Sequence, residues 1–119
     1  MAATIRPGNL NFYYSGSSVI PLTAPIFTDS LSVTTFSSGW VLQPSAVNGL
    51  DGSPTYTLQV SVTGDANDFV DYRPSFYKKI AITESMSGDT ILKGLFLRVS
   101  IDNVDNTAGD CELIIKGIS

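Results

Sequence analysis

The sequence predicts an all-β protein: an antiparallel two-sheet sandwich, jelly-roll or immunoglobulin-like, with seven to eight short strands. Three observations predict this fold. Val, Ile and Thr, which favour strands, number 9, 10 and 11, whereas Ala, Lys, Glu and Gln number only 7, 4, 2 and 2. Apolar and polar residues alternate with a period of two in several stretches. Turn signals rich in Gly, Asn, Asp and Ser separate these stretches at intervals of roughly ten residues.

Three strands are predicted most clearly. Residues 55–63 place Tyr56, Leu58, Val60 and Val62 on one face and hydroxyl or amide side chains on the other. Residues 95–102 and 111–116 show the same alternation. Weaker patterns predict five further short strands: 18–22, 30–36, 39–43, 77–83 and 90–93.

The chain of 119 residues has room for one domain. We expect residues 18–119 to form the single β-sandwich domain and residues 1–17 to form an extended N-terminal arm. No stretch predicts a long helix. The expected core consists of the inward-facing apolar residues of the predicted strands: Trp40, Tyr56, Leu58, Val60, Val62, Ile80, Ile82, Leu95, Leu97, Val99, Ile101, Leu113 and Ile115.

The composition excludes several kinds of chemistry. The sequence has no His, which excludes Ser-His-Asp and Cys-His nucleophiles and His-ligated metals. Its one Cys, Cys111, excludes an intrachain disulfide, and on the apolar face of the last strand we expect it to act as a small hydrophobic residue. The net charge of −4 argues against nucleic acid or an anionic membrane as a partner. We therefore expect no catalytic residue and no cofactor.

The charged residues are distributed very unevenly. Residues 1–50 contain two, Arg6 and Asp29, whereas residues 51–119 contain the other 16. The first half is rich in aromatic and hydroxyl residues instead, which is the composition of a buried protein–protein interface. We expect other subunits to cover this half; an ordinary core with a surface solvated by Ser and Thr is the alternative. The expected interface residues are Leu10, Phe12, Tyr13, Tyr14, Phe27 and Phe36.

Two loops rich in Asp and Asn, residues 65–71 and 102–110, are candidates for calcium binding. Calcium takes about six to eight oxygen ligands, which clustered carboxylates supply. Neither loop has the EF-hand spacing, and Asp and Asn also favour turns for backbone reasons. Structural turns are therefore the preferred interpretation, and no metal is expected. The residues kept as calcium candidates are Asp102, Asp105 and Asp110. A small hydrolase that uses paired carboxylates is a further alternative, without a motif to support it.

Aromatic residues leave a second function open, a carbohydrate-binding β-sandwich module that binds with or without the assistance of calcium. Trp40, Tyr72, Phe76 and Tyr77 are candidates for stacking on sugars, although the apolar residues after Trp40 favour a buried position for it. The segment 72–77 is also a candidate contact knob, because Pro74 breaks the strand there. The expected knob residues are Tyr72, Arg73, Phe76 and Tyr77.

Several segments together resemble a known family. They are Gly39 to Gln43, Leu50 to Val62, Asp68 to Tyr72, Leu95 to Asp102 and Cys111 to Gly117. The pattern is similar to that of small β-sandwich structural proteins of tailed bacteriophages, which are head decoration, head-fibre and tail-associated proteins. In these, a strand rich in Ser and Thr, a short Asp-Gly turn and an aromatic residue precede an Arg-x-Ser strand and a final strand ending in Lys-Gly. This sequence departs from the pattern at Gly64-Asp65, where Asp-Gly is expected. The resemblance implies a non-enzymatic virion component without catalytic residues.

We therefore expect a virion structural or accessory protein: a capsid decoration, fibre-anchoring or tail-associated subunit that acts through protein–protein assembly. The start of the sequence has no signal-peptide pattern, so we expect synthesis in the host cytoplasm and residence in the virion. The expected partners are capsid or tail subunits and further copies of the chain in a homo-oligomer, with a trimer as the first expectation.

Overall fold

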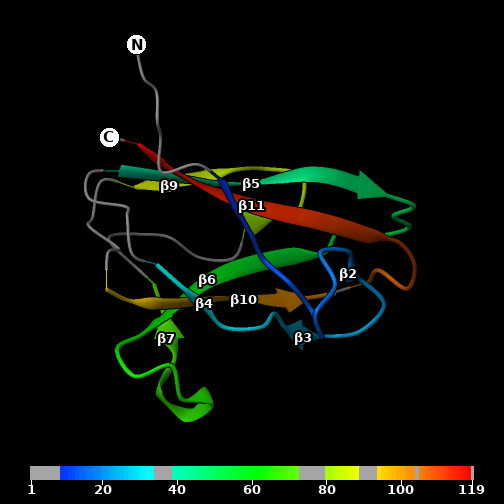
Figure 1. The fold of residues 1–119 in the computed structure, drawn as a ribbon. Coiled ribbons are helices and arrows are strands. Elements are labelled where there is room, and N and C mark those ends of the chain that lie inside the picture. Colours follow the sequence, from blue (N-terminus) through cyan, green and yellow to red (C-terminus); the bar gives the residue numbers. More distant parts are fainter. Residues whose placement is uncertain (1–8, 34–38, 73–79, 89–93, 104, 119) are drawn as a thin grey trace.

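The structure, a computed structural model, describes residues 9–33, 39–72, 80–88, 94–103 and 105–118. It confirms the predicted all-β sandwich, in which two antiparallel sheets lie one above the other (Figure 1). One short 3-10 turn, Ala66–Asp68, interrupts the strands. Within the described ranges, no helix has the length and apolarity needed to span a membrane.

The upper sheet in Figure 1 is built around one long strand pair. Its strands in spatial order are β1 (Asn9–Asn11), β11 (Asp110–Ile118), β5 (Gly39–Asn48) and β9 (Met86–Gly88), with β2 (Ile20–Pro21) also paired to β11. The pairing of β5 and β11 shifts register between Glu112 and Leu113, beside Pro44. Because Pro has no N–H for the ladder, strands accommodate it at such bulges.

The lower sheet is built around β6 (Thr55–Ser61) and β10 (Phe96–Asp102), which pair along their full length. The remaining strands of this sheet are β3 (Ile26–Phe27) and β4 (Leu31–Ser32) beside β10, and β7 (Val70–Asp71) and β8 (Ile80–Ala81) beside β6. The β10 residues Leu97, Val99 and Ile101 are buried between the sheets. The alternate residues of β10, including Arg98, therefore lie on the outer face of this sheet.

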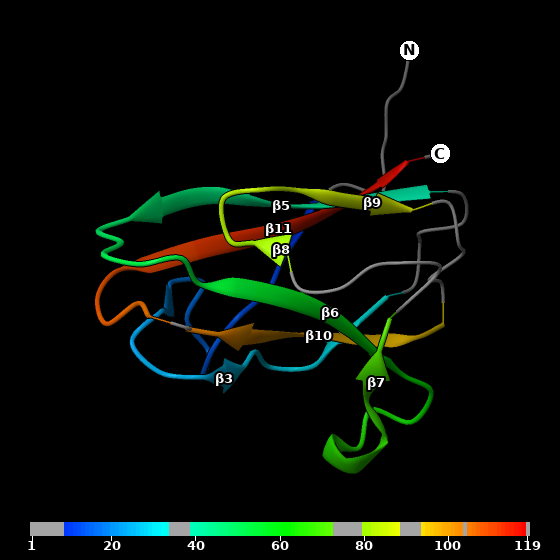
Figure 2. The same cartoon turned by 180° about the vertical axis from the view of Figure 1, so that it is seen from behind.

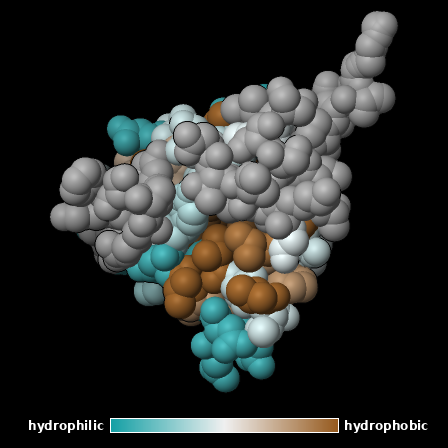
Figure 3. Space-filling view, turned by 90° about the vertical axis from the view of Figure 1, so that its left-hand side faces the viewer, coloured by the Kyte–Doolittle hydropathy of each residue, from teal (hydrophilic) through white to brown (hydrophobic). Residues whose placement is uncertain are grey.

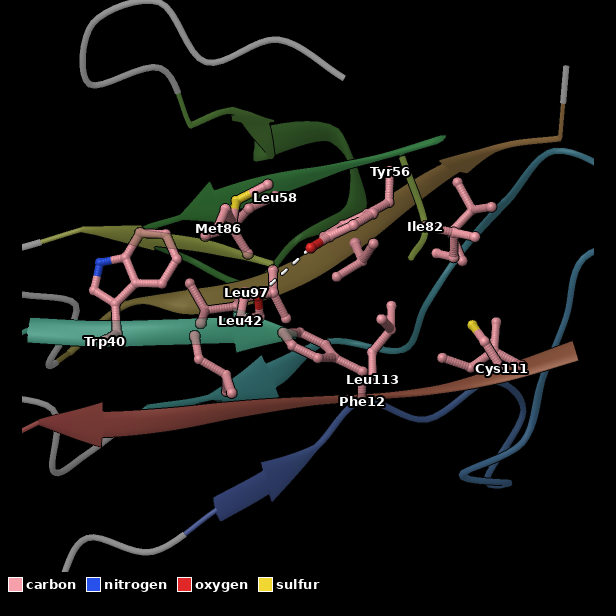
Figure 4. Packing of buried hydrophobic residues seen from close by; sticks show 14 of the residues in the cluster. Phe12, Trp40, Leu42, Tyr56, Leu58, Ile82, Met86, Leu97, Cys111 and Leu113 are labelled. Carbon is pink, nitrogen blue, oxygen red and sulfur yellow. Dashed lines mark hydrogen bonds between the residues drawn. The ribbon is translucent and has the colours of Figure 1, made fainter. Parts of the chain in front are cut away.

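The core lies between the two sheets (Figure 4). Its buried members include the predicted residues Trp40, Tyr56, Leu58, Ile82, Leu97, Val99, Ile101, Leu113 and Ile115. The remaining buried apolar residues are Phe12, Ile20, Leu22, Val33, Leu42, Met86 and Cys111. Trp40 lies opposite Gly88 on one neighbouring strand and Gly117 on the other, which leaves room for its ring.

The prediction was wrong for part of the core. Val60, Ile80 and Leu95 are only partly buried, and Val62 is 77% exposed. Strand β6 ends at Ser61, whose hydroxyl accepts hydrogen bonds from the backbone N–H groups of Thr63 and Gly64 at 3.1 and 2.9 Å. This side-chain turn takes the chain out of the sheet and carries Val62 to the surface.

The three clearest predicted strands are confirmed, whereas the weaker predictions differ from the structure in their bounds. Strand β5 extends five residues beyond the predicted 39–43. The described parts of the stretches 18–22, 30–36 and 77–83 contain the two-residue strands β2, β4 and β8, while residues 34–36 and 77–79 lie outside the described ranges. The prediction for 90–93 lies outside the described residues. The structure adds β1, β3, β7 and β9, which brings the described chain to eleven strands rather than seven or eight.

Residues 9–33 form one side of the sandwich, which we call the N-terminal wall. Its strands β1 and β2 lie beside β11, and its strands β3 and β4 lie beside β10, so the wall borders both sheets on the side facing the viewer in Figure 1. Strands β7, β8 and β9 lie on the opposite side (Figure 2). The predicted arm, residues 1–17, is therefore not free over residues 9–17; residues 1–8 lie outside the described ranges.

Candidate functional site: the N-terminal wall and the outer face around Arg98

The N-terminal wall contains a single charged residue, Asp29. Its carboxylate accepts hydrogen bonds from the backbone N–H groups of Ser15 and Gly16 at 3.2 and 3.0 Å, and thereby holds a tight turn. Both turn residues have positive φ, 50° and 82°. The single charged side chain of the wall therefore stabilises a turn in the wall's own backbone.

Three edge strands of the wall lack the features that usually prevent an exposed sheet edge from pairing with another molecule. Exposed edges are normally protected by charged residues, Pro or bulges, because their free N–H and C=O groups pair readily with other chains. Pro21 protects β2 in this way. Strands β1, β3 and β4 contain neither a charged residue nor Pro. Their short length is the feature of these three described strands that limits pairing with another molecule.

Large hydrophobic side chains are exposed on the wall. Tyr13, Val19 and Phe27 are 42%, 44% and 51% exposed, and they are three of the five large hydrophobic residues that the described chain exposes. The backbone N–H of Asp29 donates to the Tyr13 carbonyl oxygen at 2.7 Å, which joins the two halves of the wall. The wall therefore combines exposed apolar side chains with an almost complete lack of charge, as interface cores do.

The predicted interface residues take different positions. Tyr13 and Phe27 are exposed on the wall, and Leu10 and Tyr14 are partly buried against the core. The prediction was wrong for Phe12, which is fully buried inside its own chain and cannot contact another subunit. The pairing of β1 with β11 brings it there, and its N–H donates to the Leu113 carbonyl oxygen at 3.0 Å. Phe36 lies outside the described residues.

Sequence reasoning missed an arginine held between two aromatic rings. The Arg98 guanidinium carbon lies 4.0 Å from the centroid of the Phe27 ring and 4.4 Å from that of the Phe69 ring. Its Nε donates to Gln59 Oε1 at 2.7 Å, and Gln59 Nε2 donates to Asp71 Oδ1 at 2.9 Å. Alternation in the sequence places Arg98 on an outer face, but Phe27 and Phe69 come from distant segments that only the sheet register brings together.

This arrangement fixes the Arg98 side chain on the outer face of the lower sheet. Cation–π contacts with two rings and one hydrogen bond hold the guanidinium in place. Partial burial lowers the pKa of Arg98 from its usual value, but the group stays protonated at neutral pH. Because Phe27 belongs to the N-terminal wall, this cationic group borders the wall directly.

A second apolar area lies at the end of the molecule where β7 is found. Val62 and Val70 are 77% and 61% exposed. Figure 3, which shows this end, displays hydrophobic surface beside a hydrophilic projection. Exposed apolar side chains are therefore not confined to the wall, but those around β7 have the charged residues Asp65, Asp68 and Asp71 close by in the sequence.

The structure places two of the predicted aromatic contact residues inside the molecule. Trp40 is fully buried, so its ring cannot stack on a sugar. Tyr72 is partly buried and packs edge-to-face on Trp40, with 5.4 Å between the ring centroids. Trp40 Nε1 and the Tyr72 hydroxyl have no hydrogen-bond partner among the described residues. The other predicted knob residues, Arg73, Phe76 and Tyr77, lie outside the described ranges.

The predicted calcium residues do not converge. In the described part of the chain, no group of three or more acidic or Cys side chains is placed to hold a metal ion. Asp105 Oδ1 accepts from the Ser53 N–H at 2.8 Å, and Asp110 Oδ1 accepts from Asn48 Nδ2 at 3.4 Å. Asp102 lies in β10 and pairs with Thr55 in the sheet. The Asp residues of this region thus connect segments of the chain.

Two loops are joined at one end of the sandwich, at the right in Figure 1, and we call this junction the loop clasp: residues 49–53 after β5 and 105–109 before β11. The fully buried Asn106 makes four hydrogen bonds there. Its amide nitrogen donates to the carbonyl oxygens of Leu22 and Ala108 at 2.8 and 2.6 Å, and its amide oxygen accepts from the N–H groups of Asp51 and Gly52 at 3.0 and 2.9 Å. The donor and the acceptor groups of the side-chain amide are therefore all hydrogen-bonded.

Asp51 completes the loop clasp from the other side. Its carboxylate accepts from the Thr107 hydroxyl and from the Thr107 N–H, the latter at 2.7 Å. The hydrogen bonds from the Thr107 side chain and backbone hold the pKa of Asp51 below its usual value. Turn chemistry, and not ligand binding, therefore accounts for these polar residues.

Cys111 is buried in the core, as the alternation predicts. Burial, with smaller contributions from the nearby Asp110 and Glu112, raises the pKa of its thiol to about 12. The residue is therefore a neutral thiol at physiological pH and acts as a small apolar side chain.

No family model, no curated protein and no solved structure matches this chain.

Proposed function

We propose that this chain is a non-enzymatic structural subunit of a bacteriophage virion, a capsid decoration, fibre-anchoring or tail-associated protein. It acts by assembly, with the N-terminal wall covered by neighbouring protein subunits. The β-sandwich supplies a rigid scaffold, and the wall supplies the contact surface.

The observation that carries the proposal is the composition of the wall as the fold displays it. Between Arg6 and Asp51 the sequence has one charged residue, Asp29, and its carboxylate is engaged by the backbone of a turn. The same stretch provides the outer strands of both sheets on one side of the sandwich. A surface that faces water throughout usually carries charges of both signs, which this one lacks.

Exposed aromatic and aliphatic side chains give the wall the means to bind a protein. Tyr13, Val19 and Phe27 supply apolar area, and binding energy at interfaces is concentrated in a few such residues. The Ser, Thr and Asn residues around them supply hydrogen-bonding groups of the kind found at interface rims. The resemblance to small sandwich proteins of tailed bacteriophages supports a virion as the assembly.

Mass spectrometry of purified particles tests this function. Bacteriophage particles whose genome encodes the chain would be purified on a density gradient, and its copy number measured relative to the major capsid protein. We expect the ratio of this chain to the major capsid protein to be the same after the first and the second gradient. Abundant soluble host proteins should decrease from the first gradient to the second. Recovery of the chain only in the soluble fraction of the lysate would contradict the proposal.

A further inference from the structure

The guanidinium of Arg98 has N–H groups that no described acceptor engages. Among the described residues, the only acceptor for the Arg98 side chain is Gln59 Oε1, at 2.7 Å from Nε. Within the described part of the chain, no group accepts from the two terminal nitrogens of the guanidinium, which leaves their N–H groups for another acceptor. A guanidinium presents these groups as a planar fork that matches the two oxygens of a carboxylate.

The surroundings hold this fork ready for a ligand. The Phe27 and Phe69 rings contact the guanidinium at 4.0 and 4.4 Å, and the hydrogen-bond chain through Gln59 to Asp71 fixes its rotation. A side chain that is already ordered loses less conformational entropy when it binds. Phe27, which is 51% exposed, is a residue of the N-terminal wall, so the Arg98 site adjoins the wall.

We propose that Arg98 binds a carboxylate, from an Asp or Glu side chain, of the protein subunit that covers the N-terminal wall. This rests on the proposed function, since it places the partner on the wall. Charge complementarity identifies the ligand: Asp29, the one charged residue of the wall, is engaged by its own turn, so a carboxylate of the partner is the complementary group for Arg98. A single fork suits one carboxylate, and the net charge of −4 opposes a polyanion such as nucleic acid.

The test uses the whole chain, labelled with ¹⁵N at its arginine side chains, and two blocked tripeptides. We expect acetyl-Gly-Glu-Gly-amide to shift the Arg98 Nε–Hε signal in NMR spectra to a saturating value, and acetyl-Gly-Gln-Gly-amide to leave it unchanged. Arg98→Lys keeps the charge but loses the fork, so we expect binding of the glutamyl peptide, followed at backbone amides, to weaken by about tenfold. Lys116→Gln removes an exposed cation from β11 and is the matched control, with unchanged binding.

Several results would overturn the inference. One is an Arg98 signal that the glutamyl peptide does not move; another is equal weakening in Lys116→Gln. A methyl glucuronide that binds much more tightly than the peptide would assign the site to an acidic glycan instead. A changed backbone spectrum for Arg98→Lys would show that this variant alters the fold. In that case Phe69→Leu is tested instead, because it removes one ring and keeps the arginine. Weaker binding of the glutamyl peptide is again expected. These outcomes are independent of whether the chain is found in particles, so failure of the proposed function is recognised separately.

Discussion

Replacing Asn106 with Ala is expected to lower the free energy of unfolding by about 3–5 kcal/mol. The side chain is fully buried and makes four hydrogen bonds, to the backbone of Leu22, Asp51, Gly52 and Ala108. Truncation leaves two carbonyl oxygens and two N–H groups without these partners, and each unsatisfied buried group costs about 1–3 kcal/mol before water or relaxation recovers part of it. Urea unfolding followed by circular dichroism measures the loss.

Two further variants make the Asn106 experiment specific. Asn106→Asp keeps the shape and the acceptor oxygen but removes both amide N–H donors, so it is expected to be destabilising as well. Asn67→Ala is the matched control, because Asn67 is exposed and donates to Asp65 Oδ1 through its backbone N–H, which the substitution keeps. It should change stability by less than about 0.5 kcal/mol. Similar stability of Asn106→Ala and Asn67→Ala would show that the loop clasp does not stabilise the fold.

Gly109→Ala is expected to be the second severe substitution, with a loss of about 3 kcal/mol or more. Gly109 has φ of +99°, a conformation that L side chains rarely adopt. A Cβ atom there would lie 2.5 Å from the Asn48 carbonyl oxygen and 2.9 Å from the carbonyl carbon and oxygen of Gly49. These are backbone atoms at the start of the loop clasp, so the clash cannot be relieved by a side-chain rotation. Thermal unfolding of the purified variant measures the effect.

Gly16→Ala separates the cost of the dihedral angle from the cost of the clash. Gly16 also has positive φ, +82°, but no described atom lies within 4 Å of the position that a Cβ would take. We expect this variant to lose only about 1–2 kcal/mol, the cost of the left-handed conformation. If Gly16→Ala and Gly109→Ala were equally destabilising, the close approach of the two loops would not explain the requirement for Gly109.

The sequence predicts the fold where alternation is long. Strands β6, β10 and β11 were predicted closely, because seven to nine residues with period two identify a buried face without knowledge of the partner strand. The short strands β1 and β3 were missed, because two or three residues carry no period and become strands only through pairing with β11 and β10. Phe12 was misassigned for the same reason.

The candidate site was predicted in part. The lack of charge in the first half is visible in the sequence, but the position of residues 9–33 along one side of both sheets follows from strand order. The Arg98 site combines residues from positions 27, 69 and 98, which no local pattern connects. For Asn106, the residue type predicts a turn. Its burial and its four hydrogen-bond partners follow from the contact between two loops.

The central claim is that the N-terminal wall binds protein subunits, and sedimentation velocity of the isolated chain at micromolar concentrations tests it most directly. We predict an oligomer, with a trimer of about three times the 12.7 kDa chain mass as the first expectation. Tyr13→Lys combined with Val19→Lys should convert it to a folded monomer, whereas Val62→Lys, an exposed position outside the wall, should leave it unchanged. A single 12.7 kDa species for the wild-type chain at every concentration, or an oligomer that the two wall lysines do not weaken, would contradict the account.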